Sequence, residues 1–223
     1  DISDLDDGMK LVRTDLGKYY RAKGIILASG LEPKPLGTNF ERSFLGRGVS
    51  YYAQSDIERY RGKDVAVIGG GNCACYAADY LAQFVNNLYL IHRSNYIKAV
   101  RNLKYKVMNN DTINVIWNTE LTEGFGIDKL EKIKLKNMLT LQETWLDVQG
   151  VFIYAGRIPP EEILNLDLNV DEKGFIITDE FMRTSIKGVY AAGDIRSKQV
   201  RQIATAVSDG MIAAINLDKD LFQ

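Results

Sequence analysis

A glycine-rich turn is the pattern in this chain with the most specific chemistry. An apolar segment at residues 64–68 runs directly into Gly69-x-Gly71-Asn72-x-Ala74, and a stretch of helical composition follows. Glycines at this spacing allow a tight turn and close approach of the backbone to a ligand, and the next helix N-terminus presents unpaired N–H groups to an anion. The pattern predicts that Gly69, Gly71, Asn72 and Ala74 bind a dinucleotide pyrophosphate. The alternative is a structural turn without a ligand.

Two basic side chains follow the next apolar segment, residues 88–91. They are Arg93 and Lys98, and no carboxylate stands at the end of this segment. In dinucleotide-binding folds an acidic residue at this place accepts the ribose hydroxyls of NAD, whereas basic residues accommodate the 2′-phosphate of NADP. Arg93 and Lys98 therefore favour NADP over NAD. The alternative is a solvated basic face, because three further basic residues follow between 101 and 106.

Other site chemistries lack the residues that they need. The chain has two cysteines and one histidine, so a zinc site would depend on carboxylates and a nucleophilic triad could use only His92. We expect no metal site. Within a helix, the side chains of Cys73 and Cys75 point about 200° apart, which opposes disulfide geometry. We interpret both cysteines as packing residues.

Composition narrows the class of protein further. The 223 residues are 46% hydrophobic and 26% charged, which is typical of a globular chain. With 28 basic and 29 acidic residues, the net charge of −1 provides no field that would attract nucleic acid or anionic lipid. No apolar run is long enough to span a membrane, and no leader pattern opens the chain. We expect a cytoplasmic protein with neither nucleic acid nor membrane as a partner.

The order of the expected elements predicts a doubly wound α/β domain. Its strands are expected at 64–68, 88–91, 114–117 and 151–154, its helices at 75–84 and 97–107, and a β-meander between 130 and 146. One face of the second helix is expected to carry Ile97, Val100, Leu103 and Val107. Outside this region, strands are expected at 9–14 and 24–28, and a loop at 31–48. A strand and turn are expected at 188–194. The last helix is expected at 201–217, with an inner face of Ile203, Ala206, Val207, Met211 and Ala214.

Taken in order, these motifs resemble those of the thioredoxin reductase family of flavoproteins over essentially the whole chain. The resemblance rests on residues 24–30, 48–51, 61–72, 92–99, 188–194 and 201–204. It implies a Rossmann-like NAD(P)-binding domain (37–157) inserted in an FAD-binding domain (1–36 and 158–223). It places Asp194 on the flavin ribityl chain and the Gln202-Ile203 backbone near the isoalloxazine ring. The other residues that it assigns to cofactor binding are Gly156, Gly193 and Arg201.

The chain departs from the family at the redox motif. Where the family has Cys-x-x-Cys-Asp, this chain has Tyr52-Ala-Gln-Ser55-Asp56. With Tyr52 and Ser55 in place of the cysteines, we expect no dithiol relay and no catalytic residue at these positions, and Asp56 has no thiolate to protonate. Tyr52 is expected to cover the flavin face, to fill an empty groove or to be a core filler at the interface between the two domains.

A second departure concerns the start of the chain. The family begins with an FAD-binding strand and its own Gly-x-Gly-x-x-Gly turn, and neither precedes the segments matched here. We therefore expect the sequence to be a fragment of a longer protein, and tight FAD binding to require the longer form. The resemblance also implies a homodimer through the FAD domain.

Three functional hypotheses follow. The first is a flavoprotein oxidoreductase that passes hydride from NAD(P)H to FAD and then to a non-disulfide acceptor. That acceptor would be a small molecule, a quinone, oxygen or an electron-transfer protein. The second is a catalytically degenerate regulatory protein that binds nucleotide or flavin. The third is a structural α/β domain without a ligand.

Overall fold

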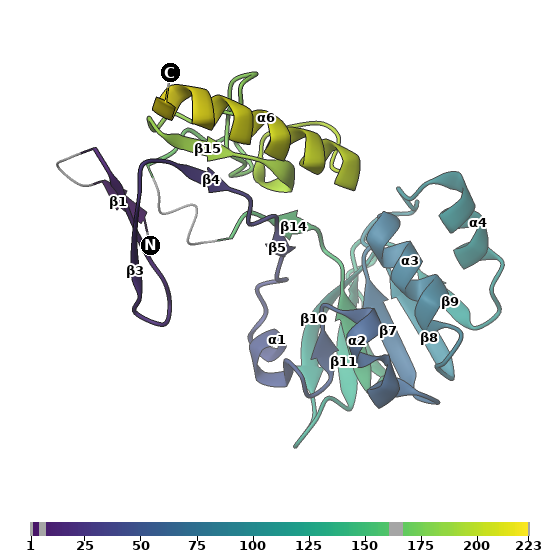
Figure 1. Cartoon of the computed structure of the whole chain (residues 1–223). Helices are drawn as coiled ribbons and strands as arrows, with labels where there is room; N and C mark the ends of the chain where they lie inside the picture. Colours follow the sequence, from purple (N-terminus) through teal and green to yellow (C-terminus); the bar gives the residue numbers. More distant parts are fainter. Residues whose placement is uncertain (1, 5–7, 161–166, 223) are drawn as a thin grey trace. The chain divides into compact units, whose positions relative to one another are not determined.

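The computed structural model describes residues 2–4, 8–160 and 167–222. The chain forms two compact units, one from Asp1–Glu32 with Arg157–Gln223 and the other from Pro33–Gly156 (Figure 1).

A five-stranded parallel sheet forms the centre of the 33–156 unit. Its strand order is β6-β13-β7-β8-β9, and every neighbouring pair is parallel. The strands in this order are β6 (Val49–Ser50), β13 (Gly150–Ile153), β7 (Asp64–Ile68), β8 (Asn87–Ile91) and β9 (Ile113–Ile116). Their near-continuous apolar sequences suit a sheet that is covered on both faces. This sheet confirms the predicted α/β fold with a Rossmann-type domain.

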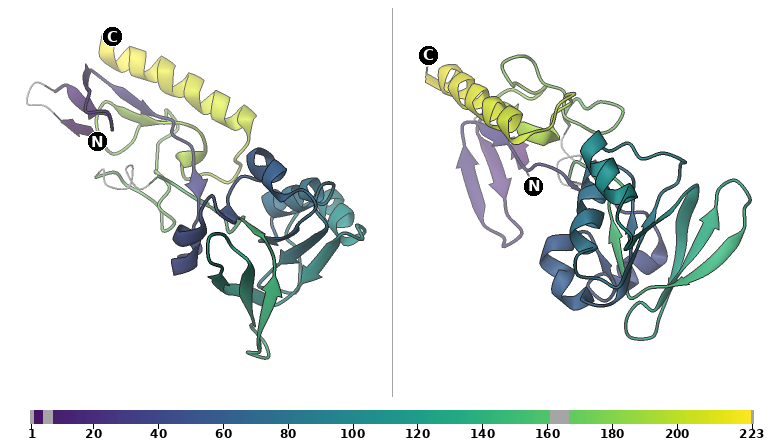
Figure 2. Two further views of the ribbon diagram at one scale, coloured as in Figure 1. Left: turned by 90° about the horizontal axis from the view of Figure 1, so that it is seen from below. Right: turned by 90° about the vertical axis from the view of Figure 1, so that its right-hand side faces the viewer.

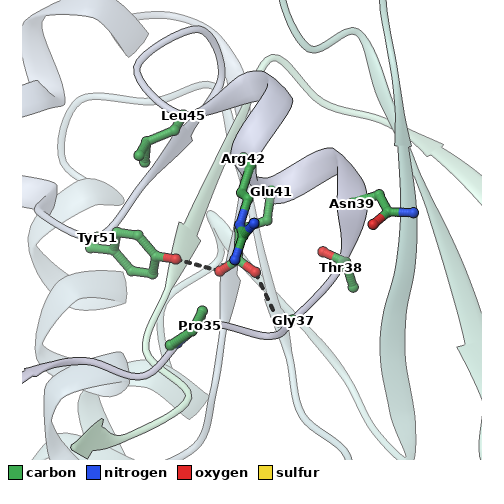
Figure 3. A pocket seen from close by; sticks show the side chains of 8 residues that line it. All are labelled: Pro35, Gly37, Thr38, Asn39, Glu41, Arg42, Leu45 and Tyr51. Atoms are coloured by element: carbon green, nitrogen blue, oxygen red, sulfur yellow. Dashed lines mark hydrogen bonds between the residues drawn. The ribbon is translucent and has the colours of Figure 1, made fainter. Parts of the chain in front are cut away.

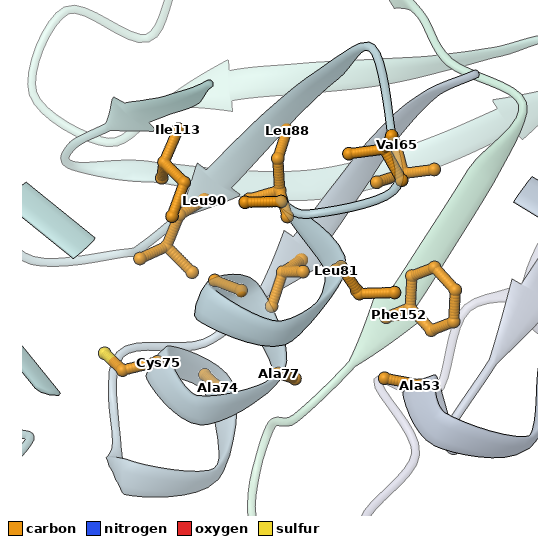
Figure 4. Close-up of a cluster of buried hydrophobic side chains, with 14 of the residues drawn as sticks. Ala53, Val65, Ala74, Cys75, Ala77, Leu81, Leu88, Leu90, Ile113 and Phe152 are labelled. Atoms are coloured by element: carbon orange, nitrogen blue, oxygen red, sulfur yellow. The ribbon is translucent and has the colours of Figure 1, made fainter. Parts of the chain in front are cut away.

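The two faces of the sheet are covered by different layers. Val65 and Val67 contact a helical layer, whereas Ala66 and Ile68 contact the other face, as the period of two along a strand requires. Figure 4 shows part of the first core, where Leu81 and Ala77 of α3 pack against the sheet. The helical layer contains α2 (Ala53–Asp56), η1 (Ile57–Tyr60), α3 (Asn72–Leu81) and α4 (Arg101–Met108).

The opposite face is covered by a short helix and a β-meander. Figure 2 shows this meander beside the parallel sheet of the same unit. Its core contains Phe40 of the helix and Leu130, Ile133 and Leu135 of the meander, all buried. The elements are α1 (Asn39–Phe44), β10 (Thr119–Phe125), β11 (Lys132–Asn137) and β12 (Glu143–Asp147).

The other unit is built on a two-stranded parallel sheet and a long helix. β4 (Ile25–Leu27) pairs with β15 (Val189–Ala191), and α6 (Ile203–Phe222) packs on this pair. The turn after β15 forms η2 (Gly193–Ile195). The remaining strands are β1 (Ile2–Asp4), β2 (Lys10–Arg13) and β3 (Tyr19–Ala22), which form an antiparallel sheet, and β5 (Glu32–Pro33), which pairs with β14 (Arg157–Ile158).

Two local predictions are wrong in the 33–156 unit. The segment expected as a loop at 31–48 contains α1. The helix expected from Ile97 begins only at Arg101, and Val100 is exposed rather than inside. The backbone before Arg101 is held by other partners, because the Lys98 N–H donates to the Gly70 carbonyl and the Val100 N–H to Asn72.

The expected inner face of the last helix is also wrong. Ile203, Val207 and Met211 are 85%, 63% and 61% exposed, and Ala214 is exposed as well. The buried side of α6 carries Asp209 and Ala213 instead, with Ala206 half-buried. The helix is apolar around much of its circumference, so periodicity alone did not identify the face that packs on β15. No helix in the described ranges is long and apolar enough to cross a lipid bilayer.

Candidate functional site

The glycine-rich turn lies between the end of β7 and the start of α3. A Cβ atom at Gly69 would lie 2.6 Å from the Tyr154 carbonyl oxygen, and one at Gly70 would lie 2.6 Å from His92 Nε2. A Cβ atom at Gly71 would meet nothing within 4 Å. Packing therefore requires glycine at the first two positions. Gly71 borders open space at the N-terminus of α3, the place that the sequence predicts for a pyrophosphate.

Asn72 and Ala74 have structural roles beside this turn. Asn72 Oδ1 accepts the N–H group of Val100 at 2.9 Å, which fixes the loop after β8. The Cβ atom of Ala74 would lie only 3.0 Å from a Cβ atom at Gly69, and Ala74 is buried. A small residue at position 74 thus permits close packing of α3 on the turn.

The loop after β8 brings the two predicted cations to the turn. The Lys98 N–H donates to the Gly70 carbonyl oxygen at 2.8 Å, and Ser94 Oγ lies 2.8 Å from His92 Nε2. The side chains of Arg93 and Lys98 are both exposed, and the Lys98 ammonium lies 5.9 Å from the centre of the Tyr96 ring. The loop thus presents two cations to solvent beside the glycine turn.

His92 belongs to the floor of this site rather than to its surface. Its ring is buried against Gly70. Burial lowers the pKa of His92 below its ordinary value, and the nearby charges of Arg93 and Lys98 lower it further. A neutral imidazole next to the turn adds no charge of its own to the anion site.

The segment from the end of β6 into α2 contains Tyr52 and Ser55, which the sequence analysis places at the cysteine positions of the family motif. Tyr52 is 56% exposed. Ser55 Oγ donates to the Tyr52 carbonyl oxygen at 3.3 Å, and Ser50 Oγ donates to Asp56 Oδ2 at 2.7 Å. Asp56 thus has a hydroxyl partner in place of a thiol.

The cysteines of α3 have different surroundings. Cys75 is buried, and burial raises the pKa of its thiol to about 11, which suits the predicted packing role. Cys73 is exposed, so its interpretation as a packing residue is wrong. Both cysteines are free. No group of metal-ligating residues occurs within the described part of the chain.

A pocket of about 370 Å³ lies beside α1 (Figure 3). Its floor is the buried carboxylate of Glu41, which accepts the N–H groups of Leu36 and Gly37, each at 3.0 Å, and the Tyr51 hydroxyl. Burial and the Glu41 carboxylate raise the pKa of Tyr51 well above its ordinary value. No pattern in the sequence predicts this arrangement, which fixes the segment before α1.

Gly156 lies just after β13, at the same edge of the sheet as the glycine turn. It has a φ of +117°, and a Cβ atom there would meet nothing within 4 Å. Its carbonyl oxygen accepts the N–H of Lys34 at 3.0 Å. Its conformation thus requires glycine, while the space beside it is free.

A second pocket, of about 480 Å³, lies within the other unit. The structure brings together here the predicted residues Gly193, Asp194, Arg201, Gln202 and Ile203. The sequence analysis assigns no ligand contact to the remaining lining residues, although three of them lie in the motifs 24–30 and 188–194. They are Ala28, Gly30, Ala192, Ala206 and Gly210.

Asp194 and Arg201 differ in how their polar atoms are satisfied. Asp194 Oδ1 is buried and has no hydrogen-bond partner among the described residues. Arg201 Nε donates to the Asp194 carbonyl oxygen at 3.0 Å, and its guanidinium lies 3.9 Å from the centre of the Phe175 ring. A buried acceptor without a partner is costly, so Asp194 fits a pocket whose ligand supplies a hydroxyl donor.

A buried carboxylate supports this pocket from α6. Asp209 lies 2.8 Å from both Arg196 Nη1 and Lys198 Nζ, and it accepts the Gly193 N–H at 3.0 Å. Burial opposes its ionisation, but hydrogen bonds from Lys198 and Arg196 keep the pKa of Asp209 below its ordinary value. The sequence analysis did not identify Asp209, because one acidic residue in an apolar helix has no distinguishing pattern.

A parallel sheet with a glycine turn and basic residues at its carboxyl edge defines the class of pyridine-nucleotide-dependent α/β proteins. The family model "Pyridine nucleotide-disulphide oxidoreductase" matches residues 3–210. The chain is 37% identical over 215 residues to the "34.2 kDa protein in rubredoxin operon" of Clostridium pasteurianum, covering 96% of this chain and 70% of that protein. It is 35% identical over 222 residues to the thioredoxin reductase of Peptoclostridium acidaminophilum, covering 97% and 70%.

A solved structure of the same kind has a closely similar fold. It is the thioredoxin reductase of Lactococcus lactis, with a TM-score of 0.91 and 36% identity, covering 99% of this chain and 72% of that one. The chain therefore belongs to the pyridine nucleotide-disulphide oxidoreductase family and is thioredoxin reductase-like, which confirms the resemblance drawn from its motifs.

Proposed function

We propose that the 33–156 unit binds NADP(H). The observation that carries this proposal is the hydrogen bond between Lys98 N–H and the Gly70 carbonyl, because it joins a cation-bearing loop to the glycine turn. The pyrophosphate would be held by the Gly71 backbone and the N-terminus of α3, with Gly69 and Ala74 packed beneath it. Arg93 and Lys98 would hold the 2′-phosphate. Asn72 would position the loop after β8, and Gly156 would leave room for the ligand at the edge of the sheet.

FAD is the cofactor proposed for the other unit when the family's N-terminal FAD-binding segment is also present. Its pocket has a buried acceptor without a protein partner, Asp194 Oδ1, which a hydroxyl of the ribityl chain would satisfy, and family membership supports the same cofactor. Asp194, Gly193 and Arg201 would hold the ribityl side, and Gln202 and Ile203 the ring. When both cofactors are bound, the nicotinamide supplies a hydride and the flavin accepts it.

The final acceptor is proposed to be something other than a disulfide of this chain. Tyr52 and Ser55 occupy the family's dithiol positions, and neither side chain can undergo thiol–disulfide exchange. The contribution of this chain is then to bind and orient two cofactors, with a small molecule, a quinone, oxygen or an electron-transfer protein as the acceptor. We propose a homodimer through the FAD-binding unit, as the family implies.

The visible absorption spectrum tests this function, recorded before and after anaerobic addition of NADPH on the purified protein with the family's N-terminal FAD-binding segment present. A flavin band that bleaches supports the oxidoreductase. A flavin band that stays oxidised favours the alternative, a regulatory protein that binds nucleotide or flavin without turnover. Calorimetric titration with NADP⁺ tests nucleotide binding separately. Absence of both flavin and NADP⁺ binding would leave the structural domain as the remaining hypothesis.

A further inference from the structure

Tyr52 is an exposed aromatic residue for which the proposed function so far has no role. It caps the N-terminus of α2 in an extended conformation, and 56% of its surface is accessible. Within the described part of the chain, its ring has no aromatic or cationic partner among the contacts found. Its phenol ring is thus free to contact a ligand.

The backbone of Tyr52 is fixed although its ring is exposed. Its N–H donates to Ser50 Oγ at 2.9 Å, and its carbonyl oxygen accepts Ser55 Oγ at 3.3 Å. Ser50 is itself buried and donates to Asp56 at 2.7 Å. With the backbone fixed, only the two side-chain torsions of Tyr52 have to be ordered when a ligand packs on its ring.

Hydrogen bonds connect this segment to the glycine turn through one residue, Tyr154. The Tyr154 hydroxyl accepts the N–H of Ala53 at 3.1 Å, so the start of α2 is joined to the end of β13. The N–H of Tyr154 donates to the Ile68 carbonyl at 2.8 Å, and its carbonyl oxygen lies 2.6 Å from the Cβ position of Gly69. Tyr154 therefore lies between Tyr52 and the turn.

The strand order sets the direction in which a dinucleotide extends. Arg93 follows β8 on one side of β7, whereas Tyr52 follows β6 on the other side, beyond β13. A ligand with its 2′-phosphate near Arg93 and its pyrophosphate at α3 must extend its second half over β13 toward β6. Two strand spacings are about 10 Å, so the end of β6 is within reach of the nicotinamide half.

We infer that Tyr52 is the platform on which the nicotinamide ring of NADP(H) packs. The inference rests on the proposed binding of NADP(H) and adds a residue that contacts the reactive ring. An aromatic face attracts a cation and stacks on flat rings. The oxidised nicotinamide ring is both flat and cationic. A cysteine at this position could not provide such a surface. Tyr52 would therefore give this chain a contact to the nicotinamide ring that a cysteine cannot make.

Calorimetric titration of the full chain with two matched probes tests this role. NADP⁺ carries the nicotinamide ring, and ADP-ribose 2′-phosphate lacks only that ring. Tyr52→Ala should weaken NADP⁺ binding about 3- to 10-fold, the range expected for loss of one ring contact. The same variant should bind ADP-ribose 2′-phosphate as the unaltered chain does. Tyr52→Phe should retain the affinity for both probes, and Tyr105→Ala, at an exposed tyrosine of α4, serves as the control.

The outcomes separate this inference from the proposed function. An unchanged NADP⁺ affinity in Tyr52→Ala overturns the platform role while leaving NADP(H) binding intact. Equal weakening for both probes also overturns it, because the substitution would then act on the fold and not on the ring contact. If the unaltered chain binds neither probe, the proposed NADP(H) site itself is wrong. Weakening confined to NADP⁺ supports the platform.

Discussion

The backbone N–H group of Lys98 donates to the carbonyl oxygen of Gly70 at 2.8 Å. This bond joins the loop after β8 to the turn after β7, so the backbone of Lys98 is held beside the turn that precedes α3. The same loop is fixed a second time, where the Val100 N–H donates to Asn72. The proposed phosphate contacts therefore depend on backbone geometry as well as on the basic side chains.

Alanine substitutions in the turn should distinguish a glycine that leaves room for the ligand from a glycine that packs against protein atoms. Gly71→Ala adds a Cβ atom that meets no protein atom within 4 Å, so it should cost less than about 1 kcal/mol in unfolding free energy. The same atom would occupy the space proposed for the pyrophosphate and should abolish NADP⁺ binding. Gly70→Ala instead places a Cβ atom 2.6 Å from His92, so it should lower stability as well.

Thermal unfolding and calorimetric titration of the two variants check this distinction. Retained NADP⁺ affinity in a folded Gly71→Ala protein would contradict the assignment of this turn to the pyrophosphate. Equal loss of stability in both variants would mean that Gly71 also has a packing role.

The basic pair should determine the choice between NADP and NAD. Arg93→Gln and Lys98→Gln each remove a charge-assisted contact to the 2′-phosphate, and each should weaken NADP⁺ binding about tenfold or more. NAD⁺ lacks that phosphate and should bind all variants alike. Lys104→Gln, at an exposed lysine of α4, controls for a general loss of positive charge. A parallel decline in NAD⁺ and NADP⁺ affinity, or an equal effect of Lys104→Gln, would support the solvated-face alternative.

The sequence was sufficient for four of the five strands of the parallel sheet, because they are apolar segments bounded by glycine and polar residues, but it did not predict the short edge strand β6. It was insufficient where tertiary contacts decide the structure. Val100 has a helical spacing with Leu103 and Val107, but its N–H group is taken by Asn72 and the helix begins at Arg101. Periodicity detects side-chain spacing and not the partners of the backbone.

The candidate site was predictable to a similar extent. Gly71, Arg93 and Lys98 stand in a recognisable pattern, and the structure brings them to one edge of the sheet. Tyr154 and Asp209 have no such pattern, because each acts through hydrogen bonds to segments that are distant in sequence or on another element. Contacts of this kind become visible only once the fold is known.

His92 should make stability depend on pH in a narrow range. Its pKa is lowered in the folded chain by burial and by Arg93 and Lys98. Below its ordinary value of about 6.5, the unfolded chain takes up a proton that the folded chain resists. The free energy of unfolding should therefore fall as pH drops below about 6.5 and level off below the folded pKa.

Proton NMR measures this titration directly, because the chain has one histidine. We expect a midpoint below 6.5 for His92 and a smaller fall in stability between pH 7 and 5 for His92→Gln. A midpoint at or above 6.5 would show that burial does not control this ring.

Asp209 should be essential for the stability of its unit. Asp209→Asn keeps the shape but removes the charge, which leaves Arg196 and Lys198 without their buried partner. Breaking a buried ion pair in this way costs about 3 kcal/mol. Asp218→Asn, at an exposed position of the same helix, should change the free energy of unfolding by less than about 0.5 kcal/mol. Urea unfolding of both variants provides the comparison, and similar midpoints would mean that the Asp209 cluster contributes no net stability.

The lost dithiol positions should still be close enough to form a disulfide. Ser55 Oγ donates to the Tyr52 carbonyl at 3.3 Å, so the side chain at position 55 turns back toward position 52 at the start of α2. The double variant Tyr52→Cys with Ser55→Cys adds two thiols to the two free cysteines of the chain. After mild oxidation, thiol titration in denaturant should detect only the thiols of Cys73 and Cys75, while Tyr52→Cys alone should keep its added thiol. If the double variant retains all of its thiols under the same treatment, the α2 segment does not hold the geometry that a dithiol relay requires, and the replacement of the cysteines was accompanied by a change of backbone.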